Sequence, residues 1–163
     1  MMRRQRVILL ALAAAAVFAA RPLQAQTVIV TVPAGASFNV SDVSASTTGT
    51  PNPVTVSYST PLLFLGSQKL MISVRADSAT FGGPGTTHIP ASAVSWTTTA
   101  SSGTPSNGTL SSTAYGEVYR SPANLNLFST GSASVRWTLG PIAAAGLRSG
   151  THTLTVRWRF EAI

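Results

Sequence analysis

The chain has 163 residues, with 11 basic and four acidic side chains, a formal net charge of +7 and no cysteine. Arg3, Arg4, Arg6 and Arg21 account for four of the basic groups, so residues 26–163 keep seven basic and four acidic side chains, a net charge of +3. This small excess argues against a nucleic-acid partner, and so few carboxylates and histidines leave little material for acid–base or metal chemistry.

Residues 1–25 are typical of a secretory signal peptide. Three arginines form a positive start, and Val7–Ala20 is an unbroken apolar run of fourteen residues. A bilayer-spanning helix needs roughly 20 apolar residues, so this run is short for a permanent anchor, which is the alternative interpretation. We expect cleavage after Ala25, with Ala20 as the fallback site, and export to the periplasm, the cell surface or the extracellular space.

The absence of cysteine excludes a lipoprotein anchor and any disulfide, so an exported fold must depend on its core alone. Residues 26–163 are numerous enough to bury such a core, and we expect them to form a single domain.

From Gln26 onward, apolar residues recur at every second position, as in half-buried strands. Five segments show this clearly: Thr27–Val32, 53–59, 69–77, 93–98 and 133–139. Weaker strands are predicted at 38–43, 62–65, 115–119 and 125–128, with turns at 48–53, 81–87 and 103–108. The polar stretch 97–113 is predicted to be either a long loop or a hairpin, and 141–147 is the one candidate helical turn.

The segment 152–162 has the clearest alternation. One face carries His152, Leu154, Val156, Trp158, Phe160 and Ala162, and the other carries Thr153, Thr155, Arg157, Arg159 and Glu161. A slip of one residue would bury two arginines, so the register is strongly specified. Short strands with one apolar face each predict an all-β fold, a two-sheet antiparallel β-sandwich of the immunoglobulin-like type.

Catalytic and metal-binding patterns are weak. Serines can be combined on paper with His88 or His152 and Asp42 or Asp77, but no G-x-S-x-G motif is present. We expect His152 to lie in the core or at its rim and His88 in an exposed loop. Neither the histidine spacing nor the acidic residues match a zinc or calcium site. We therefore predict no enzyme activity, no catalytic, cofactor-binding or metal-binding residue, and no cofactor.

Trp96, Trp137 and Trp158 could stack on sugar rings, which makes a carbohydrate-binding module the first alternative function. Each tryptophan shares its face with Val, Leu or Phe at a period of two, so we favour the core for them. Arg136, Arg157 and Arg159 would form a basic stripe for an anionic polysaccharide or lipid if their strands pair, but we favour a solvated face.

Two further patterns have a simpler explanation. Asn39 and Asn107 begin glycosylation sequons, which we interpret as chance matches behind a bacterial-type leader. A leader followed by alternating strands also fits a small outer-membrane β-barrel. The tryptophans are spread over separate strands rather than gathered in girdles, so we expect no stable membrane insertion and keep the barrel as the last alternative.

Leu147–Leu154 (LRSGTHTL) resembles the entry to a late strand of immunoglobulin-like domains, with His152 and Leu154 at the positions of the Tyr and Cys in Gly-x-Tyr-x-Cys. These departures remove the tyrosine-corner hydrogen bond and the inter-sheet disulfide of that family. A last strand opening with Ser-Gly-Thr also resembles fimbrial subunits and secreted proteins of the spore coat protein U type. In fimbrial subunits a neighbour's N-terminal extension fills the place of a missing strand.

The fimbrial resemblance implies that Gln26–Pro33 (QTVIVTVP) has the composition of a donor strand. We prefer the alternative in which Thr27–Val32 is the domain's own first strand. The sequence thus predicts an exported bacterial, non-catalytic protein with a structural, adhesive or surface-assembly role. Its expected partner is itself or another surface protein, joined by strand addition, with a polysaccharide as the alternative.

Overall fold

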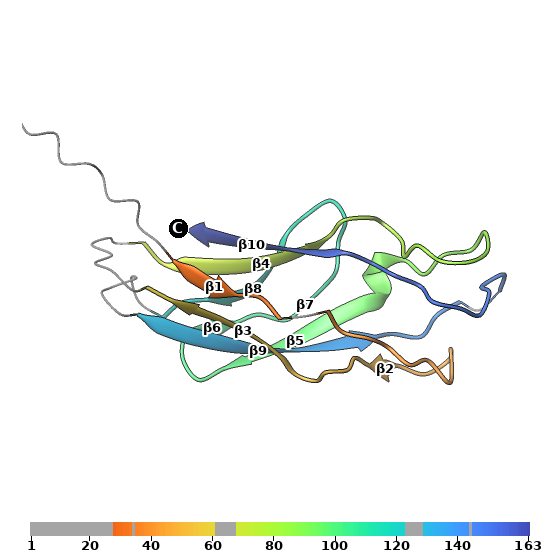
Figure 1. Ribbon diagram of the computed structural model, residues 1–163, viewed down its shortest axis with the longest axis horizontal. Coiled ribbons are helices and arrows are strands. Elements are labelled where there is room, and N and C mark those ends of the chain that lie inside the picture. Colours follow the sequence, from red (N-terminus) through yellow and green to blue (C-terminus); the bar gives the residue numbers. More distant parts are fainter. Residues whose placement is uncertain (1–27, 34, 61–67, 123–128, 144) are drawn as a thin grey trace, which may run out of the picture.

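The computed structural model describes residues 28–33, 35–60, 68–122, 129–143 and 145–163, and these form an all-β protein (Figure 1). The strands are β1 (Ile29–Thr31), β2 (Thr47–Thr48), β3 (Val54–Ser59), β4 (Leu70–Ala76), β5 (Val94–Ala100), β6 (Thr104–Pro105), β7 (Gly108–Thr109), β8 (Gly116–Arg120), β9 (Thr130–Leu139) and β10 (Val156–Ala162). A short 3-10 turn, η1 (Ala91–Ala93), precedes β5.

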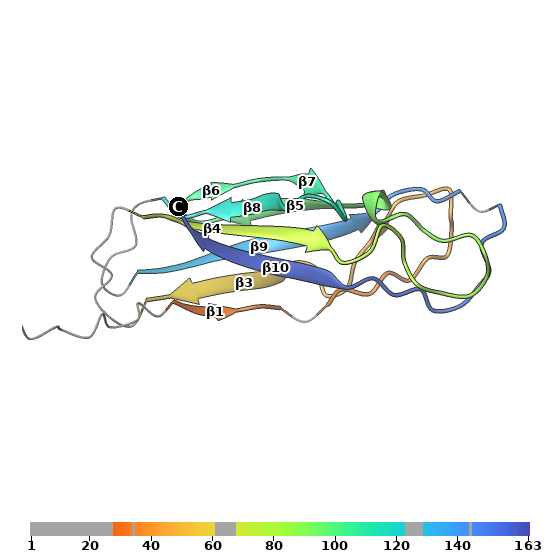
Figure 2. The same ribbon diagram turned by 90° about the horizontal axis from the view of Figure 1, so that it is seen from above.

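The strands form two antiparallel sheets. The six-stranded sheet has the order β1-β3-β9-β5-β7, with β2 paired to the far end of β9, and the four-stranded sheet has the order β10-β4-β8-β6. Figure 2 shows that β1 and β10, the first strand of each order, lie along the same side of the molecule, and that β7 and β6 lie along the other side. The two-sheet antiparallel architecture predicted from the sequence is confirmed.

The core lies between the sheets because each central strand buries alternate side chains. Strand β3 buries Val54, Val56 and Tyr58 and exposes Thr55, and β9 buries its residues from Ala133 to Leu139 in the same alternation. The four-stranded sheet contributes the even-numbered residues of β4. The rings of Tyr58 and Tyr119 meet across the core with centroids 6.2 Å apart, so the two sheets share one apolar interior.

Most predicted strands are present close to their predicted bounds. The segment Thr27–Val32 contributes β1, which pairs with β3 of its own chain through Ile29↔Ser59, Val30↔Tyr58 and Thr31↔Ser57. The weaker strand predicted at 115–119 appears as β8. The strands predicted at 62–65 and 125–128 lie outside the described residues.

Several predictions differ from the structure, among them the last strand, which begins at Val156 rather than at His152, and the turn at 103–108, which contains β6. The segment 38–43 forms no strand; only Ser37, just before it, makes an isolated bridge to Thr50. The described residues of 141–147 contain a turn and no helix, because Gly146 has a φ of +78°, outside the right-handed helical region. The stretch 97–113 is neither a loop nor one hairpin: β6 pairs with β8 in one sheet and β7 with β5 in the other.

Among the residues that the structure describes, no helix combines the length and the hydrophobicity needed to span a bilayer.

Candidate functional site: an apolar groove beside the edge of β10

Strand β10 is the edge of the four-stranded sheet, and within the described part of the chain it has a neighbour, β4, on one side only. The seven-residue pairing from Val156↔Ala76 to Ala162↔Leu70 contains no bulge. Bulges, prolines, short length and charged side chains are the usual devices that protect an edge strand against pairing with another chain, and β10 carries charges at Arg157, Arg159 and Glu161. β10 has no bulge, no proline and seven residues, and Arg157 and Arg159 are paired with Asp77 and Glu161, so its outer side is a regular template for a further strand.

The hydrogen bonds at the two ends of β10 show which of its residues bond to β4. Ile163 and Lys69 exchange two backbone hydrogen bonds of 2.9 and 2.8 Å, and Thr155 accepts one of 2.9 Å from the amide of Asp77. Because hydrogen-bonded and non-hydrogen-bonded pairs alternate along an antiparallel ladder, the odd-numbered residues of β10 bond to β4. The even-numbered residues therefore direct their N–H and C=O groups toward the open edge.

The same even-numbered residues carry the apolar side chains. His152, Leu154, Val156, Trp158 and Phe160 are all half-buried, as the predicted alternation requires, but they are less enclosed than the apolar residues of β4. Of these residues, His152, Leu154, Val156 and Trp158 line a space that no described strand fills.

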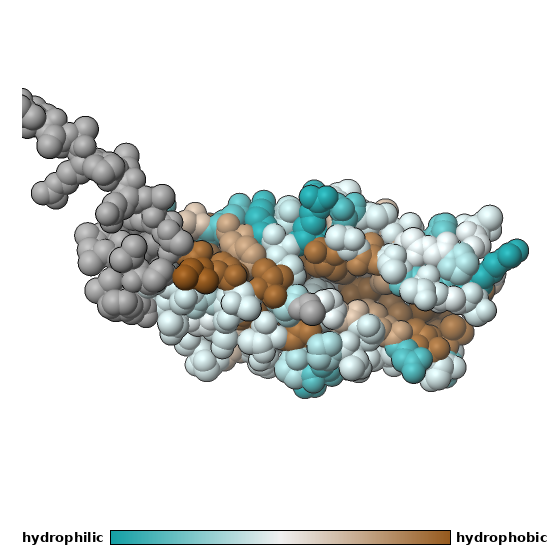
Figure 3. All heavy atoms as spheres, in the orientation of Figure 1, coloured by the Kyte–Doolittle hydropathy of each residue, from teal (hydrophilic) through white to brown (hydrophobic). Residues whose placement is uncertain are grey.

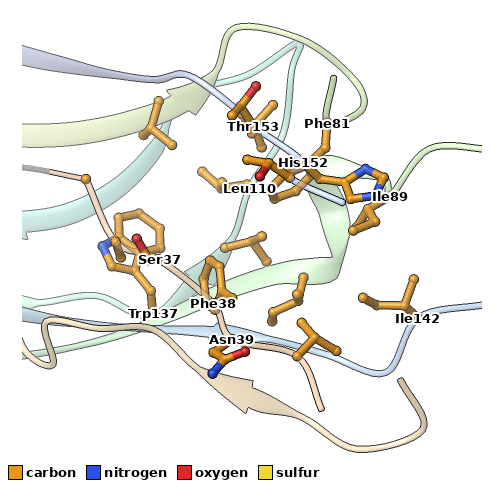
Figure 4. A pocket seen from close by; sticks show the side chains of 18 of the residues that line it. Ser37, Phe38, Asn39, Phe81, Ile89, Leu110, Trp137, Ile142, His152 and Thr153 are labelled. Atoms are coloured by element: carbon orange, nitrogen blue, oxygen red, sulfur yellow. The ribbon is translucent and has the colours of Figure 1, made fainter. Parts of the chain in front are cut away.

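That space is a groove of about 880 Å³ between the two sheets. Residues 35–40 with Val32 and Val43 form one wall, and residues 147–154 with Val156 and Trp158 form the other. The base is apolar: Phe81, Ile89, Val94, Leu110, Trp137, Leu139 and Ile142. Figure 3 shows the hydrophobic surface in this hollow, and Figure 4 shows Phe38, Trp137 and Ile142 opposite Leu110 and Ile89 around it.

The three tryptophans, which the sequence placed in the core, are buried to different degrees. Trp96 and Trp137 are buried, with ring centroids 5.9 Å apart, and the Trp96 indole N–H donates to the carbonyl of Ser106 at 3.0 Å. Trp158 is half-buried and lies at the rim of the groove. Two of the three rings are therefore enclosed rather than presented to a sugar.

The residues considered for a catalytic triad are dispersed. His88 is exposed, as predicted, and His152 lies at the rim of the groove, where its Nε2 is 3.0 Å from the carbonyl oxygen of Arg148. Asp42 accepts hydrogen bonds of 2.7 and 2.8 Å from the hydroxyl and amide of Ser44, which lower its pKa. The described residues contain no group of three or more His, Cys, Asp or Glu that could hold a metal ion.

The basic stripe predicted from Arg136, Arg157 and Arg159 does not form, because β9 and β10 belong to different sheets. Arg157 binds Asp77, and the hydrogen bond from its guanidinium holds the pKa of that carboxyl below its usual value. Arg159 pairs with Glu161 at 2.9 Å, and its guanidinium carbon lies 4.2 Å from the ring centroid of Tyr115. Both arginines of β10 thus have partners in their own sheet.

Sequence reasoning placed Val94, Trp137 and Leu139 in strands but missed the rest of the groove's base. Phe81, Ile89 and Leu110 are single apolar residues within stretches rich in glycine, serine and threonine, and periodicity gives no signal for such positions. Phe38 came from a predicted strand but instead lies in the irregular segment that forms one wall. The sequence signal that could have found these positions is a single large apolar residue within a turn-rich segment.

No protein-family model, curated protein or solved structure matches this chain.

Proposed function

We propose that this protein is an exported, non-catalytic structural protein of a bacterial surface, and that it assembles with a second copy of itself by strand addition at β10. One observation carries the proposal: Val156 and Trp158 of β10 line the groove, and the same even-numbered residues direct toward the open edge backbone groups that no described strand pairs. A strand added there gains main-chain hydrogen bonds and buries alternate side chains in a single step.

The sandwich that we propose is immunoglobulin-like. In that fold strands A, B, E and D form one sheet, and C, F and G form the other. The orders β1-β3-β9-β5 and β10-β4 match A-B-E-D and F-C, and β8 departs from the pattern because it follows β5 yet pairs with β4. In this assignment the position of strand G is the open edge of β10, which supports strand addition at that place.

A second copy is the occupant that the apolar surface favours. On the same side of the molecule as β10, the edge strand β1 and the residue after it expose Ile29 and Val32, at 51% and 44% of their surface. Large exposed apolar residues beside an apolar groove are typical of an interaction surface. A copy related by a two-fold axis brings the β10 and β1 edges of both copies to the same interface.

Export and a non-catalytic role are supported by the leader-like residues 1–25 and by the positions of the titratable groups. Asp77 accepts a hydrogen bond from Arg157, and Asp42 accepts one from Ser44. His152 lies beside a backbone carbonyl rather than a nucleophile. Carbohydrate binding has less support, since Trp96 and Trp137 are buried.

Sedimentation velocity tests the proposal, using the chain from Gln26 onward without detergent over a wide range of concentration. The diagnostic variant is Val156→Pro, because proline removes the outward N–H of an edge residue and leaves the hydrogen bonds to β4 intact. The matched control is Val156→Thr, which keeps both the N–H and the branched shape. We expect the parent and the control to self-associate and the folded proline variant to remain monomeric.

Folding of each variant is checked by circular dichroism, and Ala162→Pro, which also removes an outward N–H, replaces Val156→Pro if the latter does not fold. A parent protein that stays monomeric at every concentration overturns the proposal. So does a folded proline variant that associates as strongly as its parent.

A further inference from the structure

We infer that two copies pair β10 against β10 antiparallel, across a two-fold axis that passes through Arg159, to give one continuous eight-stranded sheet. This inference rests on the proposed strand addition and specifies its partner strand and its register. It follows from the hydrogen-bonding phase of β10 and from the order of its charges.

The hydrogen-bonding phase limits the register. The outward N–H and C=O groups belong to the even-numbered residues, so these must face even-numbered residues of the second copy. With the axis at Arg159, Trp158 faces Phe160 of the second copy and Val156 faces Ala162 of the second copy. All seven residues of β10 then have a partner, and the apolar pairs lie on the groove side of the sheet.

The charges on the outer face fit the same register. Arg157 faces Glu161 of the second copy, and the two-fold axis repeats this pair on the other side of Arg159. Opposite charges on directly facing residues stabilise an antiparallel pair, and like charges destabilise it. Because Arg157 is exposed and Glu161 is half-buried, each pair contributes modestly to the affinity, and the two pairs mainly select the register.

The neighbouring registers fit less well. An axis at Trp158 places Arg157 opposite Arg159 of the second copy, twice, so that four cations face one another. An axis at Phe160 leaves Val156 and Arg157 beyond the second copy's β10. The register through Arg159 is the one that pairs the whole strand and matches opposite charges.

The two Arg159 side chains would face each other on the axis, but contacts within each copy direct them apart. The Arg159 Nε lies 3.4 Å from the Ser73 hydroxyl of β4, and the guanidinium lies over Tyr115, which precedes β8. Both contacts lie toward the interior of the sheet, away from the open edge. With the axis at residue 159, the two backbones therefore approach closely at this position, while the two guanidinium groups stay apart.

Disulfide trapping tests the register directly, since the chain has no cysteine of its own. Facing residues in a non-hydrogen-bonded pair have Cα atoms about 4.5 Å apart, within the range of about 4.4–6.8 Å that a disulfide spans. We expect Arg159→Cys to form a disulfide-linked dimer on mild oxidation of the folded protein. The matched control, Arg136→Cys, replaces an exposed arginine on β9 and should stay unlinked.

A mixture of Arg157→Cys and Glu161→Cys chains should give more linked heterodimer than either chain forms alone. Reversing the charge with Glu161→Arg should weaken dimerisation about tenfold, because two Arg–Glu pairs become like-charged pairs. Glu117→Arg makes the same change on β8, away from the edge, and should leave dimerisation unchanged.

The outcomes separate the register from the proposed function. Self-association that Val156→Pro abolishes, together with an Arg159→Cys variant that does not crosslink, overturns the register and leaves strand addition standing. Equal crosslinking of Arg159→Cys and Arg136→Cys also overturns it. A parent protein that is monomeric throughout overturns the proposed function itself.

Discussion

The indole rings of Trp137 and Trp158 meet edge to face, with centroids 6.3 Å apart and planes inclined by 80°. Trp137 belongs to β9 in the six-stranded sheet and Trp158 to β10 in the four-stranded sheet, so this contact joins the two layers beside the groove. Trp137 also contacts Trp96, with ring centroids 5.9 Å apart. The three rings thus extend from Trp96 in the enclosed core, through Trp137, to Trp158 at the half-open rim. The stability lost when each ring is truncated should decrease in that order.

Truncating the two rings should therefore have unequal effects on stability. Trp137→Ala removes an enclosed side chain and should cost about 3–5 kcal/mol in the free energy of unfolding. Trp158→Ala should cost less, about 2 kcal/mol, since part of the ring is already in contact with water. Urea unfolding at a concentration where the protein is monomeric measures both. Equal losses would show that Trp158 is enclosed and that the groove is not open at that point.

A second prediction concerns Gly116, which lies against the six-membered ring of the Trp96 indole. A Cβ built at Gly116 would lie 2.5 Å from the indole of Trp96, and Gly108 approaches the same ring. Gly116→Ala should therefore displace the indole and cost about 1–3 kcal/mol through overpacking. Denaturant midpoints and tryptophan fluorescence measure the effect.

The control for Gly116 is Gly35→Ala, since a Cβ at Gly35 would meet nothing within 4 Å. This change should be neutral or slightly stabilising, through the lower conformational freedom of the unfolded chain. A Gly116→Ala variant as stable as Gly35→Ala would contradict the close packing of Trp96.

Alternation along the sequence was sufficient to predict which side chains each strand buries. Val54, Val56 and Tyr58 are buried and Thr55 is exposed, as a period of two requires. Alternation does not tell which strands are neighbours. Arg136 and Arg157 occupy equivalent positions on the polar faces of two strands, yet their strands lie in different sheets.

The groove could not be predicted from the sequence, again because alternation does not show which strands are neighbours. The pattern from His152 to Phe160 gives an apolar face but does not tell whether another strand covers it, because coverage depends on tertiary packing. The walls and base also include residues without periodic neighbours, such as Phe38 and Leu110. What could be predicted was one face of β10, and what could not was its free edge.

Asn107 gives a third prediction. Its side-chain oxygen accepts a hydrogen bond of 2.8 Å from the backbone amide of Thr98 in β5, beyond the two residues that β7 pairs. The asparagine thus replaces a missing strand bond, a role that the turn dipeptide Asn107-Gly108 alone did not indicate. Asn107→Ala should cost about 1–3 kcal/mol, because the amide of the buried Thr98 loses its acceptor.

Hydrogen exchange of the Thr98 amide, together with urea unfolding, measures the loss. The matched control is Asn39→Ala, at an exposed asparagine, which should change the free energy of unfolding by less than about 0.5 kcal/mol. Unchanged protection of the Thr98 amide in Asn107→Ala would show that the side-chain hydrogen bond contributes nothing.

The last prediction concerns acid stability. Arg157 donates two hydrogen bonds to Asp77, 2.6 Å from Nε to Oδ1 and 2.9 Å from Nη2 to Oδ2, and the side-chain hydrogen bond lowers the pKa of Asp77. A carboxyl group whose pKa is lower in the folded protein adds stability at pH values above its unfolded pKa, about 3.9. That stability is lost as the pH falls through the lower, folded pKa.

Arg157→Gln removes the charge and the paired hydrogen bonds, so the Asp77 pKa should return toward its ordinary value. The variant should then be less stable than the parent at neutral pH, and the difference should shrink below about pH 4, where Asp77 is protonated in the unfolded chain. Denaturant midpoints across this pH range, measured on dilute monomer, check it. Arg136→Gln, on the other sheet, should show no such convergence; a pH-independent difference for Arg157→Gln would mean that the ion pair does not act through the ionisation of Asp77.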